Sequence, residues 1–262
     1  MALRRTLDEG TYVHAYLISG LRGTGKRSLA MLMAQYLLCT CQSQPQGLFA
    51  GLGLPEAARP CGSCAGCVQV RSGNHPDLIR FGGGRHISQD SKDSGKSTIT
   101  VGDIREAVRI ASTHTYEGGS RVFIIEQAED MTPQAQNCLL KTLEEPIDGN
   151  VFLLTTDSPS LMLPTIISRC RQLRLHAYPD SFISTRLQSL GLDAGQQATV
   201  LRSCSGSVGK AIELAGDEAF WKRRTQVMTD FFSLKGRSDI VRVSGRYKDA
   251  RDQADDLLTE AE

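Results

Sequence analysis

The sequence has no apolar run long enough to cross a membrane. Its longest apolar runs, at residues 122–125 and 151–154, fall far short of the roughly 20 residues that a membrane-spanning helix needs. The N-terminal segment MALRRTLDEG contains two arginines but no apolar stretch behind them, so it does not predict a secretory signal. We therefore expect a cytoplasmic protein with no membrane partner.

An excess of charge of either sign is also absent. The 262 residues include 30 lysines and arginines and 29 aspartates and glutamates, which gives a formal net charge of +1. Strong, autonomous binding of nucleic acid needs a clear positive excess. We therefore expect any contact with DNA to be shared with partner proteins.

Predicted strands and helices alternate through the first two thirds of the sequence. The apolar runs that predict strands lie at residues 13–19, 77–81, 121–125, 151–155 and 172–176. Their alternation with helical patterns predicts a parallel α/β sheet. After residue 179 only helices are predicted, at residues 181–190, 194–203 and 207–215. A small helical domain is therefore expected to follow the sheet.

A glycine-rich loop lies between the first predicted strand and the first predicted helix. Its sequence GLRGTGK, at residues 20–26, matches the first seven positions of the phosphate-binding pattern G-x-x-x-x-G-K-[ST]. Backbone N–H groups of such a loop cradle phosphates, and Lys26 is expected to reach the terminal ones. A glycine-rich turn with a solvated lysine is the alternative, which the flanking strand and helix disfavour. The candidate phosphate-binding residues are Gly20, Gly23, Thr24, Gly25, Lys26, Arg27 and Ser28.

Residues that ATP hydrolysis requires are missing around this loop. The eighth position of the pattern, normally a Ser or Thr that holds Mg²⁺, is Arg27, and Ser28 comes one residue late. The strand that usually ends in Asp-Glu ends here in Glu126-Gln127, and Gln127 cannot accept a proton from water. We expect metal binding to be compromised and intrinsic ATPase activity to be absent. Binding of ATP or ADP stays open, because Lys26 and the glycines remain.

Three cysteines lie close together at residues 61–67, in the pattern C-x2-C-x2-C. This spacing is typical of tetrahedral zinc sites, and cysteines of a cytoplasmic chain stay reduced. Cys39 is the first candidate for the fourth ligand, Cys41 competes with it, and His75 is a weaker candidate. Four thiolates leave no open coordination position, so the predicted site is structural. The expected zinc ligands are Cys39, Cys61, Cys64 and Cys67.

A series of motifs runs through most of the chain. They are HAYL at residues 14–17, GLRGTGK at 20–26, NHPD at 74–77, VGDIRE at 101–106, LLKTLEEP at 139–146 and LPTIISRC at 163–170. The combination of LLKTLEEP and SRC is very specific. In these motifs the sequence closely resembles the bacterial clamp-loader family of AAA+ proteins, which load the sliding clamp onto DNA for DNA polymerase III.

The resemblance implies a chain in three parts. An AAA+ P-loop core is expected at residues 1–177, with a zinc-binding module at about residues 39–67. A helical lid domain is expected at residues 178–216 and a short or partial helical collar segment at residues 217–262.

The resemblance also favours a subunit that does not hydrolyse ATP. Gamma/tau members of the family keep an intact phosphate loop, an Asp-Glu pair and an arginine in the lid. This sequence has Arg27, Gln127 and Gly209 at those positions. A gamma/tau-like subunit that binds and hydrolyses ATP is the alternative.

The resemblance assigns a role to Arg169 in the SRC motif. It implies an arginine finger that enters the ATP site of a neighbouring gamma/tau subunit, where such a residue can dominate the rate. Local pairing of Arg169 with an acidic side chain is the structural alternative. The implied partners are the gamma/tau and delta subunits and, through the assembly, the sliding clamp and primed DNA.

Overall fold

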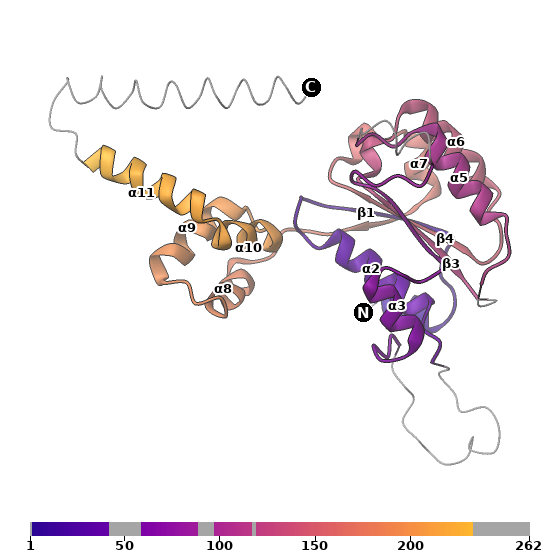
Figure 1. The fold of residues 1–262 in the computed structure, drawn as a ribbon, viewed down its shortest axis with the longest axis horizontal. Coiled ribbons are helices and arrows are strands. Elements are labelled where there is room, and N and C mark those ends of the chain that lie inside the picture. The colour runs from indigo at the N-terminus through magenta and orange to yellow at the C-terminus, as the bar shows by residue number, and fades with distance from the viewer. Residues whose placement is uncertain (1, 42–58, 89–96, 117–118, 233–262) are drawn as a thin grey trace, which may run out of the picture.

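The computed structural model describes residues 2–41, 59–88, 97–116 and 119–232 (Figure 1). The first part of the chain forms a sheet with helices on both faces. Its strands are β1 (Ala15–Ser19), β2 (Leu78–Gly82), β3 (Arg121–Glu126), β4 (Asn150–Thr156) and β5 (Arg171–Arg174). Its helices are α1 (Ala2–Asp8), α2 (Lys26–Leu37), α3 (Ala65–Ser72), α5 (Val101–Ala111), α6 (Pro133–Glu144) and α7 (Pro164–Arg169), with 3-10 turns η1 (Ala128–Asp130) and η2 (Pro159–Leu161).

All neighbouring strands of the sheet are parallel, in the order β2-β3-β4-β1-β5. Strand β1 lies between β4 and β5, so that Ile18 is opposite both Thr155 and Leu173. Because parallel strands end at a common edge, the loop after β1 lies beside the residues that follow β4. The predicted fold class, a parallel P-loop sheet followed by a helical domain, is confirmed.

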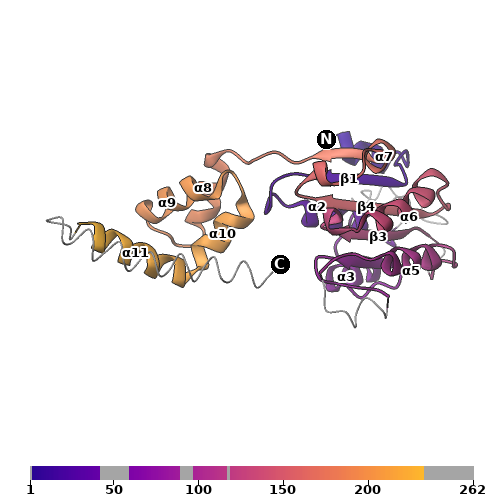
Figure 2. The ribbon, with the colours of Figure 1, turned by 90° about the horizontal axis from the view of Figure 1, so that it is seen from above.

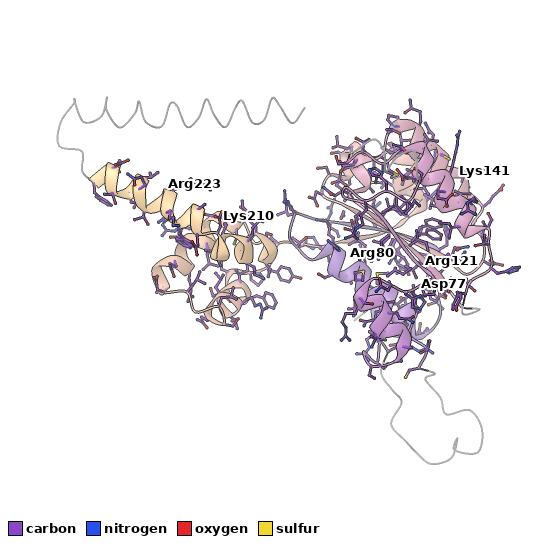
Figure 3. The ribbon with its side chains drawn as sticks, viewed as in Figure 1. Asp77, Arg80, Arg121, Lys141, Lys210 and Arg223 are labelled. Atoms are coloured by element: carbon purple, nitrogen blue, oxygen red, sulfur yellow. The ribbon has the colours of Figure 1, made fainter. Side chains whose placement is uncertain are left out.

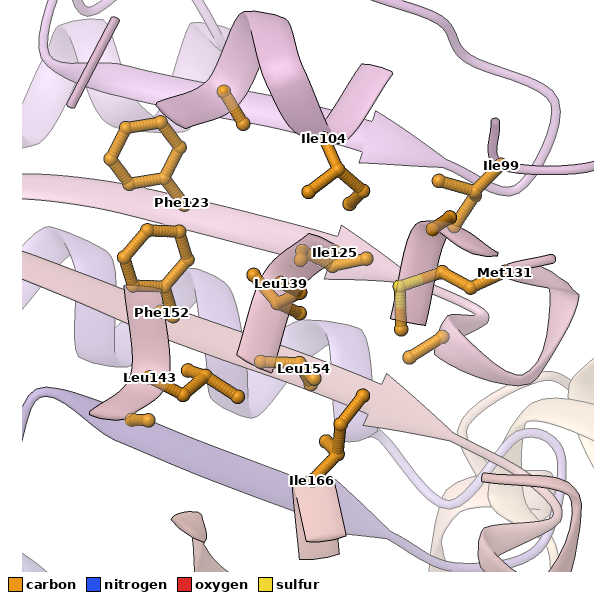
Figure 4. Packing of buried hydrophobic residues seen from close by; sticks show 14 of the residues in the cluster. Ile99, Ile104, Phe123, Ile125, Met131, Leu139, Leu143, Phe152, Leu154 and Ile166 are labelled. Atoms are coloured by element: carbon orange, nitrogen blue, oxygen red, sulfur yellow. The ribbon is translucent and has the colours of Figure 1, made fainter. Parts of the chain in front are cut away.

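Apolar side chains fill both faces of the sheet. Helices α5, α6 and α7 cover one face, where the rings of Phe123 and Phe152 stack with their centroids 4.6 Å apart (Figure 4). Helices α2 and α3 cover the opposite face, where Ile18 and Met33 are fully buried. Central strands covered on both sides explain why β3 and β4 have continuous apolar runs instead of alternating ones.

Side-chain caps determine where two helices of the core begin. Thr132 Oγ1 accepts a hydrogen bond from the backbone N–H of Ala135 at 3.1 Å, and Pro133 is the first residue of α6. Thr100 caps α5 in the same way, and Asp103 completes a capping box. Helix α6 ends at Glu144, before Pro146, because the residue that precedes a proline disfavours the helical conformation.

Helices α8 (Asp180–Gln188), α9 (Ala194–Cys204) and α10 (Val208–Gly216) form a small domain with its own core. The buried residues of that core are Ile183, Leu187, Val200, Cys204 and Ala211. An extended segment after β5 connects this small domain, which is called the lid below, to the sheet (Figure 2). Helix α11 (Glu218–Phe232) follows, and none of its residues is buried. Within the described ranges, every helix is too short or too polar to span a membrane.

Two helices of the structure were not predicted, α1 and α3, which have 7 and 8 residues. Both are too short to show a clear apolar period. Residues 42–58 of the predicted zinc module and residues 233–262 of the predicted collar segment lie outside the described residues. The three-part division of the chain therefore stays a prediction.

A buried ion pair connects the amino-terminal ends of β2 and β3. Arg121 Nη2 lies 3.1 Å from Asp77 Oδ1, and the two side chains are 6% and 2% exposed. Asp77 also accepts the backbone N–H of Tyr116 at 2.9 Å, and Arg121 donates to the carbonyls of Thr113 and His114 at 3.0 and 2.7 Å. Figure 3 shows Asp77 and Arg121 beside each other. The pair therefore fixes the connection between α5 and β3 to the edge of the sheet.

Replacing Asp77 by alanine is expected to lower the free energy of unfolding by about 3–5 kcal/mol, because Arg121 then stays buried without its charge partner. Urea denaturation followed by circular dichroism measures this loss. Arg5→Ala is the control, since it removes only an exposed pair with Glu9 and should cost less than about 1 kcal/mol. Equal losses in the two variants would contradict the role given to the buried pair.

Candidate functional site

The candidate phosphate loop connects β1 to α2, as predicted. Gly23 and Gly25 have φ angles of 78° and 90°, a region that favours glycine. Thr24 is buried, and its Oγ1 donates to the carbonyl of Leu21 at 2.7 Å, which closes the loop on itself. The first turn of α2 begins at Lys26. The structure places the predicted residues Gly20, Gly23, Thr24, Gly25, Lys26, Arg27 and Ser28 in this loop and in that first turn.

The ammonium group of Lys26 is held by oxygens of the protein itself. It donates to the carbonyls of Gly20 and Leu21, both at 2.8 Å, and it forms an ion pair with Asp157. The Lys26 side chain is 9% exposed and that of Asp157 is 33% exposed. An ammonium group has three N–H donors, and these three oxygens match that number. The lysine that such loops aim at phosphate is therefore fully engaged.

Glu126 ends β3, at the position where a hydrolytic site would orient a metal ion. Its side chain is 13% exposed and is surrounded by arginines. Glu126 Oε1 lies 2.7 Å from Arg80 Nη2, 3.5 Å from Arg27 Nε and 3.8 Å from Arg85 Nη1. Three guanidinium groups around one carboxylate leave a positive surplus, which disfavours a divalent cation there. Arg27 thus adds a cation at the position where the pattern would supply a metal-binding hydroxyl.

The lid domain contacts the phosphate loop directly. Ser207 Oγ donates to the carbonyl of Arg22 at 2.7 Å, and the backbone N–H of Gly209 donates to the carbonyl of Gly23 at 2.8 Å. A Cβ atom at Gly209 would lie 2.8 Å from Gly23 Cα, so a side chain there would push α10 off the loop. A cavity of about 460 Å³ lies between the loop, the end of β3 and Gly209.

Arg169 is the last residue of α7 and is partly exposed. Its Nη2 lies 2.5 Å from Glu144 Oε1, and its Nη1 donates to the carbonyl of Thr165 at 3.0 Å. The local acidic pairing considered as the alternative is thus present in the isolated chain. Glu144 is 48% exposed, and ion pairs at such exposure contribute only about 0–1 kcal/mol. The guanidinium can therefore exchange this partner for another anion at low cost.

Four cysteines that are apart in the sequence come together in space. The sulfur atoms of Cys39, Cys61, Cys64 and Cys67 all lie within 4.8 Å of one another. Cys39 Sγ lies 3.8 Å from the sulfurs of Cys61 and Cys64, and Cys61 Sγ lies 3.9 Å from that of Cys67. Four sulfurs placed tetrahedrally about 2.3 Å from zinc lie about 3.8 Å apart. The cluster therefore fits a tetrahedral metal ion such as zinc.

The structure also separates the candidates for the fourth ligand. Among the described residues, the metal-sized group includes Cys39 and not Cys41. His75 is buried, and its Nδ1 accepts the backbone N–H of Asp77 at 3.1 Å. This geometry favours Cys39, the first of the three candidates.

Hydrogen bonds within the cluster favour the thiolate form at two positions. Burial raises the pKa of Cys64, but hydrogen bonds from Thr40 and from the backbone N–H of Cys67 outweigh it and hold the pKa at about 5. Backbone N–H groups of Cys64 and Ser63 lower the pKa of Cys61 to about 7. Burial raises the pKa of Cys67 to about 12. A cation at the centre would favour loss of that proton, because thiolates are the metal-binding form.

Three residues of the site were not identified from the sequence: Asp157, Arg80 and Arg85. Asp157 directly follows β4, a neighbour of β1 in the sheet, so the rule that sites lie at the carboxyl ends of parallel strands was a usable signal for it. Arg80 and Arg85 belong to no motif. Their approach to Glu126 depends on the pairing of β2 with β3, which only the fold provides.

Comparison with known proteins places the chain in a family. Residues 1–179 match the family described as DNA polymerase III, delta subunit. DNA polymerase III subunit delta′ of Bacillus subtilis is 32% identical, over 86% of this chain and 61% of that protein. Subunit delta′ of Escherichia coli is 33% identical, over 81% and 57%. Subunit tau/gamma of Haemophilus influenzae is 30% identical, over 88% and 31%. The chain spans about three fifths of the length of these delta′ relatives.

Solved structures with a similar fold are more distant. A DNA polymerase III gamma subunit-related protein of Thermotoga maritima has a TM-score of 0.44 at 19% identity, over 77% of this chain and 56% of that protein. The RuvB Holliday junction branch migration motor of the same organism has a TM-score of 0.45 at 18% identity, over 82% and 57%. On the family match and its relatives, the chain belongs to the DNA polymerase III delta-subunit family, with delta-prime favoured over tau/gamma.

Proposed function

We propose that this chain is a delta-prime subunit of the bacterial clamp loader, the assembly that loads the sliding clamp onto DNA for DNA polymerase III. Membership of the family and the similarity to delta′ subunits support the proposal. Its partners are the gamma/tau and delta subunits in a cytoplasmic hetero-oligomer. Contacts with the sliding clamp and primed DNA are made through that assembly.

Within the assembly the chain does not hydrolyse ATP itself. The observation that carries this proposal is the arrangement of charge at the phosphate loop. Lys26 is paired with Asp157, and Glu126 is surrounded by Arg27 and Arg80. A site that hydrolyses ATP needs a lysine that contacts the phosphates and a metal ion that bridges the phosphate oxygens. The proposal therefore assigns no ATP or ADP cofactor to this chain.

A gamma/tau-like ATPase is the second candidate, supported by the 30% identity to subunit tau/gamma of Haemophilus influenzae. The two candidates differ in a simple observation on the purified chain. Turnover of ATP that disappears in Lys26→Ala would favour the gamma/tau-like function.

The proposed contribution of this chain to catalysis is Arg169. The residue is partly exposed at the end of a helix, and its pair with Glu144 is weak, so it is free to meet a negatively charged partner. In a neighbouring ATP site its guanidinium would stabilise the charge that spreads over the transferring phosphoryl group. Helix α7 packs against the sheet through the buried Ile166, and this packing holds the backbone of Arg169 in place.

Replacing Arg169 by alanine should lower the kcat of ATP hydrolysis in a clamp loader reconstituted with clamp and primed DNA. An arginine finger supplied in trans is worth about 10³–10⁵ in kcat at its site. Only the ATP site next to Arg169 should lose activity, and the other ATP sites of the assembly should keep theirs. The total rate of ATP hydrolysis should therefore fall by the part that this one site contributes, with little change in KM for ATP. Release of inorganic phosphate measures the rate.

Two control variants distinguish this role from a general surface effect. Glu144→Gln removes the local partner and keeps Arg169, so the rate should be retained. Arg171→Ala removes another exposed arginine two residues away and should also retain it. An unchanged rate in Arg169→Ala, or an equal loss in Arg171→Ala, would refute the finger assignment.

We also propose that the cysteine cluster holds one structural Zn²⁺. The sulfur separations of 3.8 to 3.9 Å and the four-thiol donor set support this choice. The ion would join Cys39, which lies just after α2, to α3, which carries Cys67. It would supply only cross-linking, because four thiolates leave no open position for a substrate.

Carefully purified chain is expected to contain about one zinc per molecule by elemental analysis. Cys39→Ser should lower the zinc content and the melting temperature, because it removes one of the four thiolates. Cys41→Ser is the matched control and should retain both. Wild-type protein with substoichiometric zinc would contradict the metal site, and zinc loss in Cys41→Ser alone would assign the fourth ligand to Cys41.

A further inference from the structure

The phosphate loop has the sequence of an anion-binding site, but its lysine, Lys26, already forms an ion pair with the carboxylate of Asp157. In loops of this pattern the lysine contacts the terminal phosphates of a nucleotide. Here one carboxylate oxygen of Asp157 pairs with Lys26 Nζ instead. The same ammonium also holds the carbonyls of Gly20 and Leu21, so its donors point to three oxygens of this chain.

We propose that the carboxylate of Asp157 is a built-in counter-ion that takes the place of phosphate at Lys26, so that the phosphate loop and the lid stay together without a nucleotide. This goes beyond the proposed subunit function, because it assigns a role to a residue outside every motif of the family resemblance. It concerns the isolated chain, whereas the arginine finger concerns a neighbour. The two proposals can therefore fail separately.

Neighbouring groups hold Asp157 in position. Its backbone N–H donates to Glu129 Oε1 at 2.9 Å, which connects the end of β4 to the turn after β3. The next residue, Ser158, donates its backbone N–H to Thr156 Oγ1 at 3.1 Å. These bonds fix the chain on both sides of the carboxylate. Asp157 is thus set at the carboxyl edge of the sheet, opposite the loop that follows β1.

The ion pair orders the loop for its contact with the lid. Lys26 binds the carbonyls of Gly20 and Leu21, and the next two carbonyls, of Arg22 and Gly23, accept hydrogen bonds from the lid. The carbonyls of four successive residues therefore accept hydrogen bonds from one ammonium group and from two donors at the start of α10. Without the Asp157 charge, the ammonium keeps only neutral acceptors, which bind it more weakly. Loss of this charge should then loosen the loop and the lid contact together.

Nucleotide binding tests the first half of the proposal. The purified full chain should bind a fluorescent ATP analogue with a Kd weaker than about 1 mM, with or without Mg²⁺. Asp157→Asn keeps the size of the side chain and removes its charge, so Lys26 becomes available to phosphate. We expect the Kd to fall by about tenfold or more in this variant. Asp157→Ala is the second variant and should behave in the same way.

Hydrogen exchange tests the second half. The amide of Gly209 donates to the carbonyl of Gly23, so its exchange rate reports on the contact between lid and loop. In Asp157→Asn without nucleotide, we expect exchange at Gly209 to be about tenfold faster than in the wild type. Amides in the middle of β3, such as those of Phe123 and Ile124 in the buried centre of the sheet, should keep their protection and show that the core is still folded.

Matched variants make the outcome decisive. Asp148→Ala removes an exposed acid at the other end of β4 and should leave nucleotide affinity and exchange as in the wild type. The double variant with Lys26→Ala and Asp157→Asn should lose the gained affinity, because the freed cation is then gone. Tight nucleotide binding by the wild type, or no change in either readout for both Asp157 variants, would overturn the proposal.

Discussion

The buried ammonium of Lys26 is the constraint on which the candidate site depends. A cation with 9% exposure must be neutralised and hydrogen-bonded, because its desolvation is otherwise too costly. The chain meets this demand with an acidic side chain from the end of β4 and two carbonyls of its own loop. Only a parallel sheet with β1 beside β4 brings these groups to one edge. Lys26 thus binds the loop at Gly20 and Leu21, and the lid contacts the next two carbonyls of the same loop.

A second group of charges, formed by Glu126, Arg27 and Arg80, occupies the place where the pattern would bind a metal ion. With Arg27 in the place of a hydroxyl, a Mg²⁺ ion would face repulsion, and Glu126 instead accepts from Arg80 at 2.7 Å. Arg27, at the eighth loop position, and Glu126, at the end of β3, therefore belong to one cluster of charged side chains. Gly209 fits the same picture, since it lets the backbone of the lid approach Gly23, at the position where the family resemblance places an arginine in hydrolytic subunits.

Much of the fold was predictable because the sequence contains strong local signals. Continuous apolar runs identified β3 and β4, and the glycine-rich loop identified the connection between the first strand and the first helix. The cysteine spacing pointed to a metal-sized cluster, and the structure favoured Cys39 over Cys41 because the end of α2 lies against α3. The partner of Lys26 lies 131 positions further along the chain, and no local pattern connects the two. Likewise, Arg169 pairs with Glu144 because α6 and α7 pack against each other. No local pattern in either helix predicts that contact.

Lys26 and Arg169 lie in opposite environments. Lys26 is buried and neutralised at the carboxyl end of β1, whereas Arg169 is partly exposed just before β5, the strand that pairs with β1. The pairing of β1 with β5 therefore connects the phosphate loop to the segment that carries Arg169. Under the two proposals, Asp157 keeps the loop in one state, and the position of Arg169 does not depend on nucleotide at this subunit's own loop. A fixed arginine is what a neighbouring ATP site needs, because catalysis by a positioned charge depends on its being in place before the reaction begins.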